Sequence, residues 1–268
     1  MKRFLLPFFV ALALPVQAEN LLELNTADQV RAYTAVGRLE LNGRGFCTAT
    51  LISTDLVLTA AHCLYEKGTD NLVPLEGLTF NAGLRNGRAE ATRQVRRTAI
   101  HEQYLLGNED PVTSVSTDLA LIELSQPIRT ARITPLMVER TRRSLSEVAL
   151  VSYAKDREEA LSLERSCDVL ARHSSVQVLS CDVDFGASGA PVFVMDAGVP
   201  RVIAVVSAKA NWDGQKVALA AGVETAIDDL RLRLSDGAVA ASLVIPQIRS
   251  VGGSGVRMQG AGAKFLRP

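Results

Sequence analysis

The sequence lacks an excess of either charge and, beyond its first residues, any long apolar run. Its 268 residues include 29 Lys+Arg and 29 Asp+Glu. No long-range electrostatic field therefore favours a nucleic-acid partner. After residue 18 no segment stays apolar over the roughly 20 residues that cross a bilayer, so we expect no membrane anchor in the mature chain. With 47% hydrophobic and 22% charged residues, the composition is that of a soluble globular protein.

Histidine and cysteine are also scarce, with three and four residues. A zinc site needs clustered ligands, and these two residue types are adjacent only at His62-Cys63. We therefore expect no metal and no organic cofactor. In an oxidising compartment four cysteines indicate two disulfides, for which three pairings are open.

The first twenty residues, MKRFLLPFFVALALPVQAEN, have the pattern of a secretory signal peptide. A basic pair precedes an apolar run over residues 4–16, and the small residue Ala18 follows. This pattern predicts a signal peptide over residues 1–18, and the apolar run is too short for a membrane anchor. The mature protein is then expected in a periplasm or outside the cell.

Short apolar runs separated by turn signals predict an all-β domain between about residues 34 and 234. A helical spacing of apolar residues predicts a closing helix over residues 223–234. The rest, residues 235–268, reads as a Gly-rich extension. The runs expected to form strands are residues 45–52, 56–59, 119–124, 148–151, 191–194 and 202–206.

The stretch VDFGASGAP, residues 183–191, places Ser188 between two glycines. A serine hydroxyl becomes a nucleophile when a histidine, oriented by a carboxylate, removes its proton. All three histidines, His62, His101 and His173, precede Ser188. This order excludes the α/β-hydrolase arrangement, in which histidine follows serine. A subtilisin-like order would need an alternating α and β pattern, which is absent.

The order that remains is histidine, aspartate, serine. LTAAHC places His62 after an apolar strand, and TDLALIEL places Asp118 directly before a buried strand, where a lone carboxylate needs a partner. The glycines around Ser188 leave the amides of Gly186 and Ser188 free to face a developing oxyanion.

These three segments, LTAAHC, TDLALIEL and GASGAP, resemble the chymotrypsin-fold (trypsin-like) serine peptidases over residues 34–234. The resemblance implies two six-stranded antiparallel Greek-key β-barrels in a domain over residues 19–234, with the barrel boundary near residues 130–145. It makes His62 the general base and acid, Asp118 its orienting carboxylate and Ser188 the acylated nucleophile. Gly186 and Ser188 would form the oxyanion hole.

The resemblance also implies the disulfide pairing. GFCTATLIS is similar to the family strand whose cysteine bonds the cysteine after the catalytic histidine, which pairs Cys47 with Cys63. Cys167 then pairs with Cys181. Ala187 replaces an aspartate that trypsin uses in its activation switch, so we expect no such switch. CDVDFGASGAP is closer to the bacterial branch that includes glutamyl endopeptidases.

Four residues are matched to the substrate site. Asp182, six residues before Ser188, occupies the position that selects Arg or Lys in trypsin. Ser207 and Lys209 lie in a segment similar to the strand that binds the substrate backbone, and Gly222 resembles the other pocket wall. Lys209 replaces a glycine. Three interpretations of Lys209 stay open: it pairs with Asp182, it attracts an acidic substrate, or it faces solvent.

The sequence therefore predicts a secreted, monomeric serine endopeptidase that acts on protein or peptide substrates and cleaves after Arg or Lys. The alternatives are a glutamyl-type or small-residue-specific peptidase, an esterase, and a catalytically silent trypsin-fold binding module. His101 lies in HEQY, similar to a family turn, and is expected to be structural.

Overall fold

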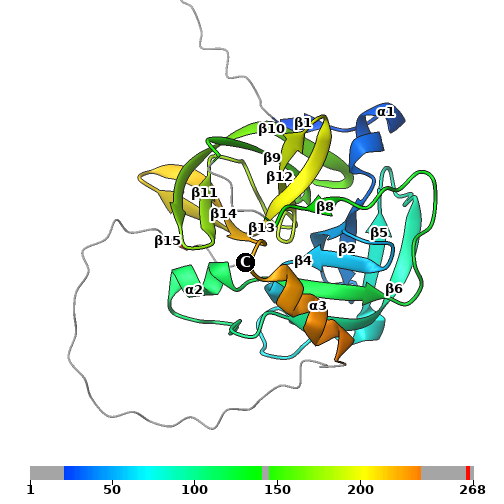
Figure 1. Cartoon of the computed structure of the whole chain (residues 1–268), viewed down its shortest axis with the longest axis horizontal. Coiled ribbons are helices and arrows are strands. Elements are labelled where there is room, and N and C mark those ends of the chain that lie inside the picture. The colour runs from blue at the N-terminus through cyan, green and yellow to red at the C-terminus, as the bar shows by residue number, and fades with distance from the viewer. Residues whose placement is uncertain (1–20, 141–144, 237–263, 266–268) are drawn as a thin grey trace, which may run out of the picture.

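The computed structural model describes residues 21–140, 145–236 and 264–265 (Figure 1). The predicted signal peptide and most of the Gly-rich extension lie outside the described residues. The described chain forms two closed antiparallel β-barrels of six strands each, which confirms the two-barrel architecture. None of its helices is long and apolar enough to cross a membrane.

The first barrel closes in the order β2-β3-β4-β7-β6-β5. Alternating apolar residues point inward, as in β5, where Leu78, Phe80 and Ala82 are buried and the residues between them are half-buried. This period of two is the signature of a half-buried strand. The strands are β2 (Val36–Leu41), β3 (Phe46–Leu51), β4 (Leu56–Thr59), β5 (Leu78–Ala82), β6 (Ala91–Ile100) and β7 (Ala120–Leu124).

The second barrel follows the path β10-β11-β14-β13-β12-β9 and closes through the pairing of β9 with β10. Its strands are β9 (Glu147–Ala154), β10 (Arg157–His173), β11 (Val176–Leu179), β12 (Pro191–Asp196), β13 (Val199–Trp212) and β14 (Gln215–Gly222). Short strands extend it at three places: β1 (Leu21–Glu23) pairs with β10, while β8 (Met137–Val138) and β15 (Lys264–Phe265) pair with β13.

All six apolar runs named above form strands. The predicted barrel boundary, residues 130–145, falls in the connection between β7 and β9 that carries β8. The remaining elements are short helices: α1 (Ala27–Val30), η1 (Arg31–Tyr33), η2 (Ala61–Leu64), η3 (Leu75–Gly77), α2 (Pro111–Ser116) and α3 (Ile227–Ser235).

The closing helix is shorter than predicted. α3 begins at Ile227, because Val223 lies in a turn in which its carbonyl accepts from the backbone of Ala226 and its N–H donates to Ile203. The apolar residues at helical spacing nevertheless face the core, as expected. Ile227, Leu230 and Leu234 are buried, and the helix packs against β6 and β7 of the first barrel.

Candidate active site

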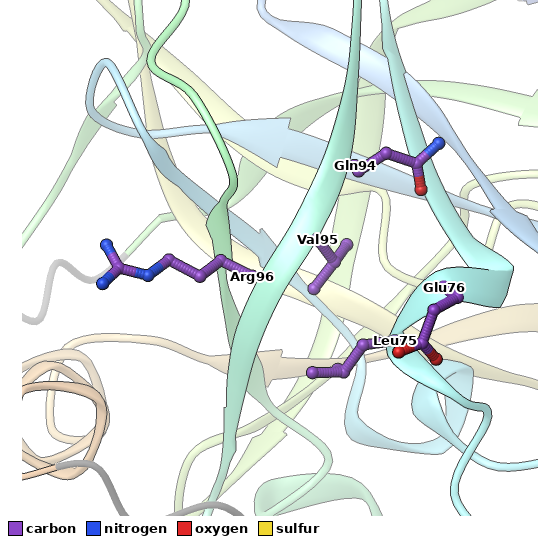
Figure 2. Close-up of a pocket in the computed structure, with 5 residues that line it drawn as sticks. All are labelled: Leu75, Glu76, Gln94, Val95 and Arg96. Carbon is purple, nitrogen blue, oxygen red and sulfur yellow. The ribbon is translucent and has the colours of Figure 1, made fainter.

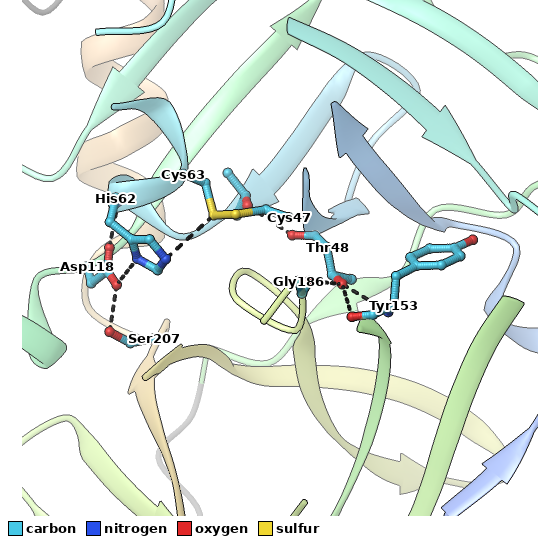
Figure 3. Close-up of a disulfide and its surroundings, with 9 residues drawn as sticks. Cys47, Thr48, His62, Cys63, Asp118, Tyr153, Gly186 and Ser207 are labelled. Atoms are coloured by element: carbon cyan, nitrogen blue, oxygen red, sulfur yellow. Dashed lines mark hydrogen bonds and ion pairs between the residues drawn. A yellow bond between two sulfur atoms is a disulfide. The ribbon is translucent and has the colours of Figure 1, made fainter. Parts of the chain in front are cut away.

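His62 is held by a disulfide and a single helical turn. β4 ends at Thr59, and the 3-10 helix η2 then carries His62 and Cys63. Cys63 is bonded to Cys47 on β3, with the two Cα atoms 6.2 Å apart. The pairing implied by the resemblance is therefore present, and it fixes the segment that carries the imidazole to the neighbouring strand (Figure 3).

Asp118 lies between α2 and β7 and is 2% exposed. A carboxylate so deeply buried requires hydrogen-bond donors. It has three: the backbone N–H of His62 donates to Oδ1 at 2.9 Å, His62 Nδ1 lies 2.7 Å from Oδ2, and Ser207 Oγ donates to Oδ2 at 2.6 Å (Figure 3). Two of these donors come from His62 and one from β13 of the second barrel.

The carboxylate sets the state of the imidazole. Burial lowers the pKa of His62, but the negative charge of Asp118 and its hydrogen bond to Nδ1 outweigh burial, so the pKa is raised above its usual value. A proton on Nδ1 donates to Asp118, which leaves Nε2 as the acceptor in the neutral ring. The His62 side chain is 23% exposed, which gives the ring access to a substrate.

Ser188 lies in a tight loop before β12. Ala187 N–H donates to the Asp184 carbonyl at 2.9 Å, and Ala190 N–H donates back to Ala187 at 3.0 Å. Gly189 has a φ of +80°, and a Cβ there would overlap the Thr48 carbonyl oxygen. Only glycine fits this position without a shift of the first barrel's backbone.

The loop around Ser188 presents two free amides. Within the described residues, neither the Gly186 nor the Ser188 N–H donates to a protein acceptor. Gly186 has a φ of +94°, and its carbonyl accepts from Thr48 Oγ1 at 2.8 Å. Two such N–H groups beside a serine hydroxyl could together stabilise a developing oxyanion.

Backbone contacts bring Ser188 beside the His62–Asp118 pair. The N–H of Gly189 donates to the Val206 carbonyl at 2.8 Å, one residue before Ser207, which binds Asp118. Across the described chain, no hydrogen bond joins Ser188 Oγ to His62. Nε2 lies 3.9 Å from Cys63 Sγ, a disulfide sulfur that has no proton to donate to it. Catalytic hydrogen bonds are often long or poorly aligned until a substrate binds.

Thr48 is a site residue that the sequence analysis missed. It is fully buried on β3. Its N–H donates to the Ser188 carbonyl at 2.9 Å, and its hydroxyl donates to Gly186 and accepts from Tyr153 N–H at 3.0 Å. The available signal was the two threonines, Thr48 and Thr50, inside the apolar run GFCTATLI; both are buried, and only the fold shows that Thr48 is the one whose hydroxyl is bonded. The bond of Ser207 to Asp118 was also missed.

Asp182 follows the second disulfide, Cys167–Cys181, whose Cα atoms are 5.1 Å apart. This pairing too is the one implied by the resemblance. The side chain of Asp182 is exposed, and its backbone N–H donates to Glu164 Oε2 at 2.9 Å. Glu164 is buried, and burial, as the largest cause, raises the pKa of its carboxyl group.

Lys209 pairs with Asp184, not with Asp182. Its Nζ lies 2.6 Å from Asp184 Oδ1 and 4.1 Å from the centre of the Phe185 ring. The hydrogen bond from Lys209 is the main cause that lowers the pKa of Asp184. The suggested Lys209–Asp182 pair is therefore wrong: both acids are exposed near β13, and only the fold decides which of them meets the ammonium group.

The structure also places the remaining predicted residues, Gly222, His101 and His173. Gly222 ends β14, and its N–H donates to Ser175 at 2.7 Å. The His101 carbonyl accepts from Tyr104 N–H at 3.0 Å in a turn, and burial lowers the pKa of His101. His173 ends β10, and no contact recorded for the described residues brings it to the His62–Asp118 pair.

Metal ligands are not available at the two places where His, Cys and acidic groups converge in the described chain. One is Cys47, His62 and Cys63, and the other is Glu164, Cys167 and Cys181. Each contains both halves of a disulfide, so neither offers a thiolate.

A separate hollow of about 430 Å³ lies on the first barrel (Figure 2). It is formed by η3 and β6, and none of the residues around Ser188 contributes to it. Its walls mix apolar side chains with one acid and one base, which favours no particular ligand. The residues lining it are Leu75, Glu76, Gln94, Val95 and Arg96.

The Thr48 hydroxyl should stabilise the protein measurably. Thr48→Val leaves the Gly186 carbonyl without its donor and the Tyr153 N–H without its acceptor, so we expect a loss of about 2 kcal/mol in the free energy of unfolding. Thr50 on the same strand is the matched control, because it is 1% exposed and its hydroxyl has no partner among the described residues. Thr50→Val should cost less than about 0.5 kcal/mol. Urea unfolding of both variants measures the difference, and equal losses would contradict the role of Thr48.

Comparison with known proteins agrees with this geometry. The chain is 30% identical over 166 residues to serine protease 23 of Homo sapiens, a match that covers 55% of this chain and 43% of that protein. It is 36% identical over 84 residues to a trypsin of Phaedon cochleariae, covering 31% of this chain and 29% of that one. It thus spans less than half the length of the curated relatives it matches.

A solved structure of a Glu endopeptidase in complex with MPD superimposes with a TM-score of 0.67 at 14% identity, covering 81% of this chain and 96% of that chain. This likeness shows the shared fold. The family model described as Trypsin matches residues 25–230, which include both barrels and every residue placed around Ser188. The chain therefore belongs to the trypsin family.

Proposed function

We propose that this protein is a serine endopeptidase that forms an acyl-enzyme on Ser188. The observation that carries the proposal is the buried Asp118 carboxylate bound to His62 Nδ1 at 2.7 Å. It orients the ring, leaves Nε2 to act as a base and lies beside the loop that holds Ser188. A protein that only binds other proteins has no need of a buried charge placed in this way.

Each step uses one of these groups. Nε2 of His62 takes the proton of Ser188 Oγ as Oγ bonds to the substrate carbonyl carbon, whose oxygen becomes an oxyanion facing the amides of Gly186 and Ser188. The C–N bond then breaks as His62 passes its proton to the leaving amine. Water, deprotonated by His62, attacks the acyl carbon, and the Ser188 oxygen leaves with the returned proton.

For the substrate, we propose cleavage after Arg or Lys, selected by Asp182. Among the described residues no cation pairs with the Asp182 carboxylate, which is exposed. Lys209, the nearby cation on β13, is engaged by Asp184 at 2.6 Å. The charge of Asp182 therefore stays available to a basic substrate side chain. A preference for cleavage after acidic or small residues would contradict this proposal.

For location, we propose export to the periplasm or the exterior, where the protein acts as a monomer on proteins or peptides. Both disulfides support this, since disulfides persist in oxidising compartments.

Covalent labelling tests the proposed activity. A fluorophosphonate probe should label the disulfide-bonded protein at Ser188, and Ser188→Ala should abolish labelling and lower kcat by a factor on the order of 10⁶. Ser125→Ala, at an exposed serine, is the control and should label normally. Correctly folded protein that takes up no label would favour a binding module, and hydrolysis of esters alone would favour an esterase.

The pH dependence follows from the raised pKa of His62. The base must be neutral, so kcat/KM should fall as the pH drops through a value above about 6.5. In Asp118→Asn the causes that raise the pKa are lost while burial remains, so this limb should move to lower pH. Ser207→Ala removes a neutral partner of Asp118 and should leave the limb above about 6.5. Profiles of kcat/KM against pH measure the shift, and identical profiles for Asp118→Asn and the unaltered protein would contradict the assignment.

Peptide-library cleavage tests the substrate class. The unaltered protein should cleave after Arg and Lys, and Asp182→Ser should lower kcat/KM for such peptides by at least about tenfold, because the substrate cation loses its partner. Asp168→Ser, at an exposed acid on β10, is the control. An unchanged preference in Asp182→Ser would show that another group selects the substrate.

A further inference from the structure

One edge of strand β13 has backbone partners at both of its ends, whereas no described strand pairs with the positions between them. At one end, Val206 N–H donates to Ala190 at 2.9 Å and its carbonyl accepts from Gly189, the residue after Ser188. At the other end, Ala210 and Asn211 pair with β15. No described strand pairs with this edge at the three positions between, 207–209.

β15 must occupy this edge because the opposite one is already taken. β14 pairs with β13 in register from Ala208 to Trp212, and a strand has only two edges. β15 therefore lies on the same edge as the loop of Ser188. The three open positions span about 10 Å at the usual rise of a strand.

The direction of β15 points toward the nucleophile. The pairing is antiparallel, with Lys264 opposite Asn211 and Phe265 opposite Ala210. Each step forward along β15 is thus a step back along β13. A strand that continues this register meets Lys209 next and then approaches Ser207, whose hydroxyl binds Asp118.

We propose that the segment around β15 is an intramolecular, substrate-like inhibitor, held on the open edge of β13 by backbone pairing. The proposal rests on the proposed function, since it concerns access to the same site. Extended peptides commonly bind by adding a strand to an open sheet edge. The segment also carries a basic residue, Arg267, in keeping with the proposed selection of basic residues by Asp182.

The strength of the effect follows from tethering. A short paired strand binds weakly, but its covalent attachment to the same chain can give it an effective concentration in the millimolar range. Substrate and segment would compete for the same edge. Competition raises KM and leaves kcat unchanged, because saturating substrate displaces the segment.

The test compares the mature full chain with a form that ends at residue 263, on a short peptide substrate. We expect kcat/KM to be at least about fivefold higher in the shortened form, through KM. In the full chain, Lys264→Pro removes the backbone N–H opposite Asn211 and should raise kcat/KM similarly, whereas Lys264→Ala keeps the N–H and should not.

A binding measurement separates this proposal from the proposed function. A fluorescent peptide of residues 258–268 should bind the shortened form carrying Ser188→Ala and bind the full-length Ser188→Ala protein at least about fivefold more weakly. Equal kcat/KM with and without residues 264–268, or equal peptide binding to both forms, would overturn the inhibitor while leaving the peptidase intact. If neither form hydrolyses peptides or takes up a fluorophosphonate, the proposed function fails. Peptide binding alone then tests whether the segment around β15 docks on β13.

Discussion

The buried carboxylate of Asp118 is the constraint on which the rest of the site depends. Removing a carboxylate from water is costly unless donors replace the lost hydration. The donors here come from both barrels: His62 from the first, through its backbone and ring, and Ser207 from β13 of the second. The same three contacts that make the burial tolerable also orient the imidazole and fix the position of one barrel against the other.

A second set of contacts holds the loop of Ser188 beside Asp118 and His62. Thr48, next to the disulfide-bonded Cys47, contacts Gly186 and Ser188, while Gly189 is bonded to β13 beside Ser207. The loop of Ser188 is therefore bonded both to β3, which is linked to the His62 segment by a disulfide, and to β13, which contacts Asp118. A loop fixed at both ends keeps its free amides oriented before a substrate arrives, which is the preorganisation that oxyanion stabilisation requires.

The two-barrel fold and the candidate site residues could be predicted from the sequence, because they depend on residue types that are scarce in this chain, above all histidine. Only three histidines were available; two of them precede both Asp118 and Ser188, and of these only His62 lies in a segment similar to the family's catalytic histidine motif. Side-chain partnerships were harder. Asp182 and Asp184 are both exposed acids close to β13, so strand register and loop shape, not spacing, decide which one meets Lys209. Thr48 likewise gains its role from strands distant in sequence, and apolar spacing alone could not locate the start of α3.

The proposed substrate binding and its proposed control both involve β13, which contacts Asp118 through Ser207, carries Lys209 and pairs with β15. The central claim, that Asp118, His62 and the loop of Ser188 form one hydrolytic site, is tested most directly by a crystal structure of the phosphonylated protein. The account predicts an adduct on Ser188 Oγ with its phosphoryl oxygen within hydrogen-bond distance of the Gly186 and Ser188 amides. An adduct on another residue, or an oxygen turned away from both amides, would contradict it.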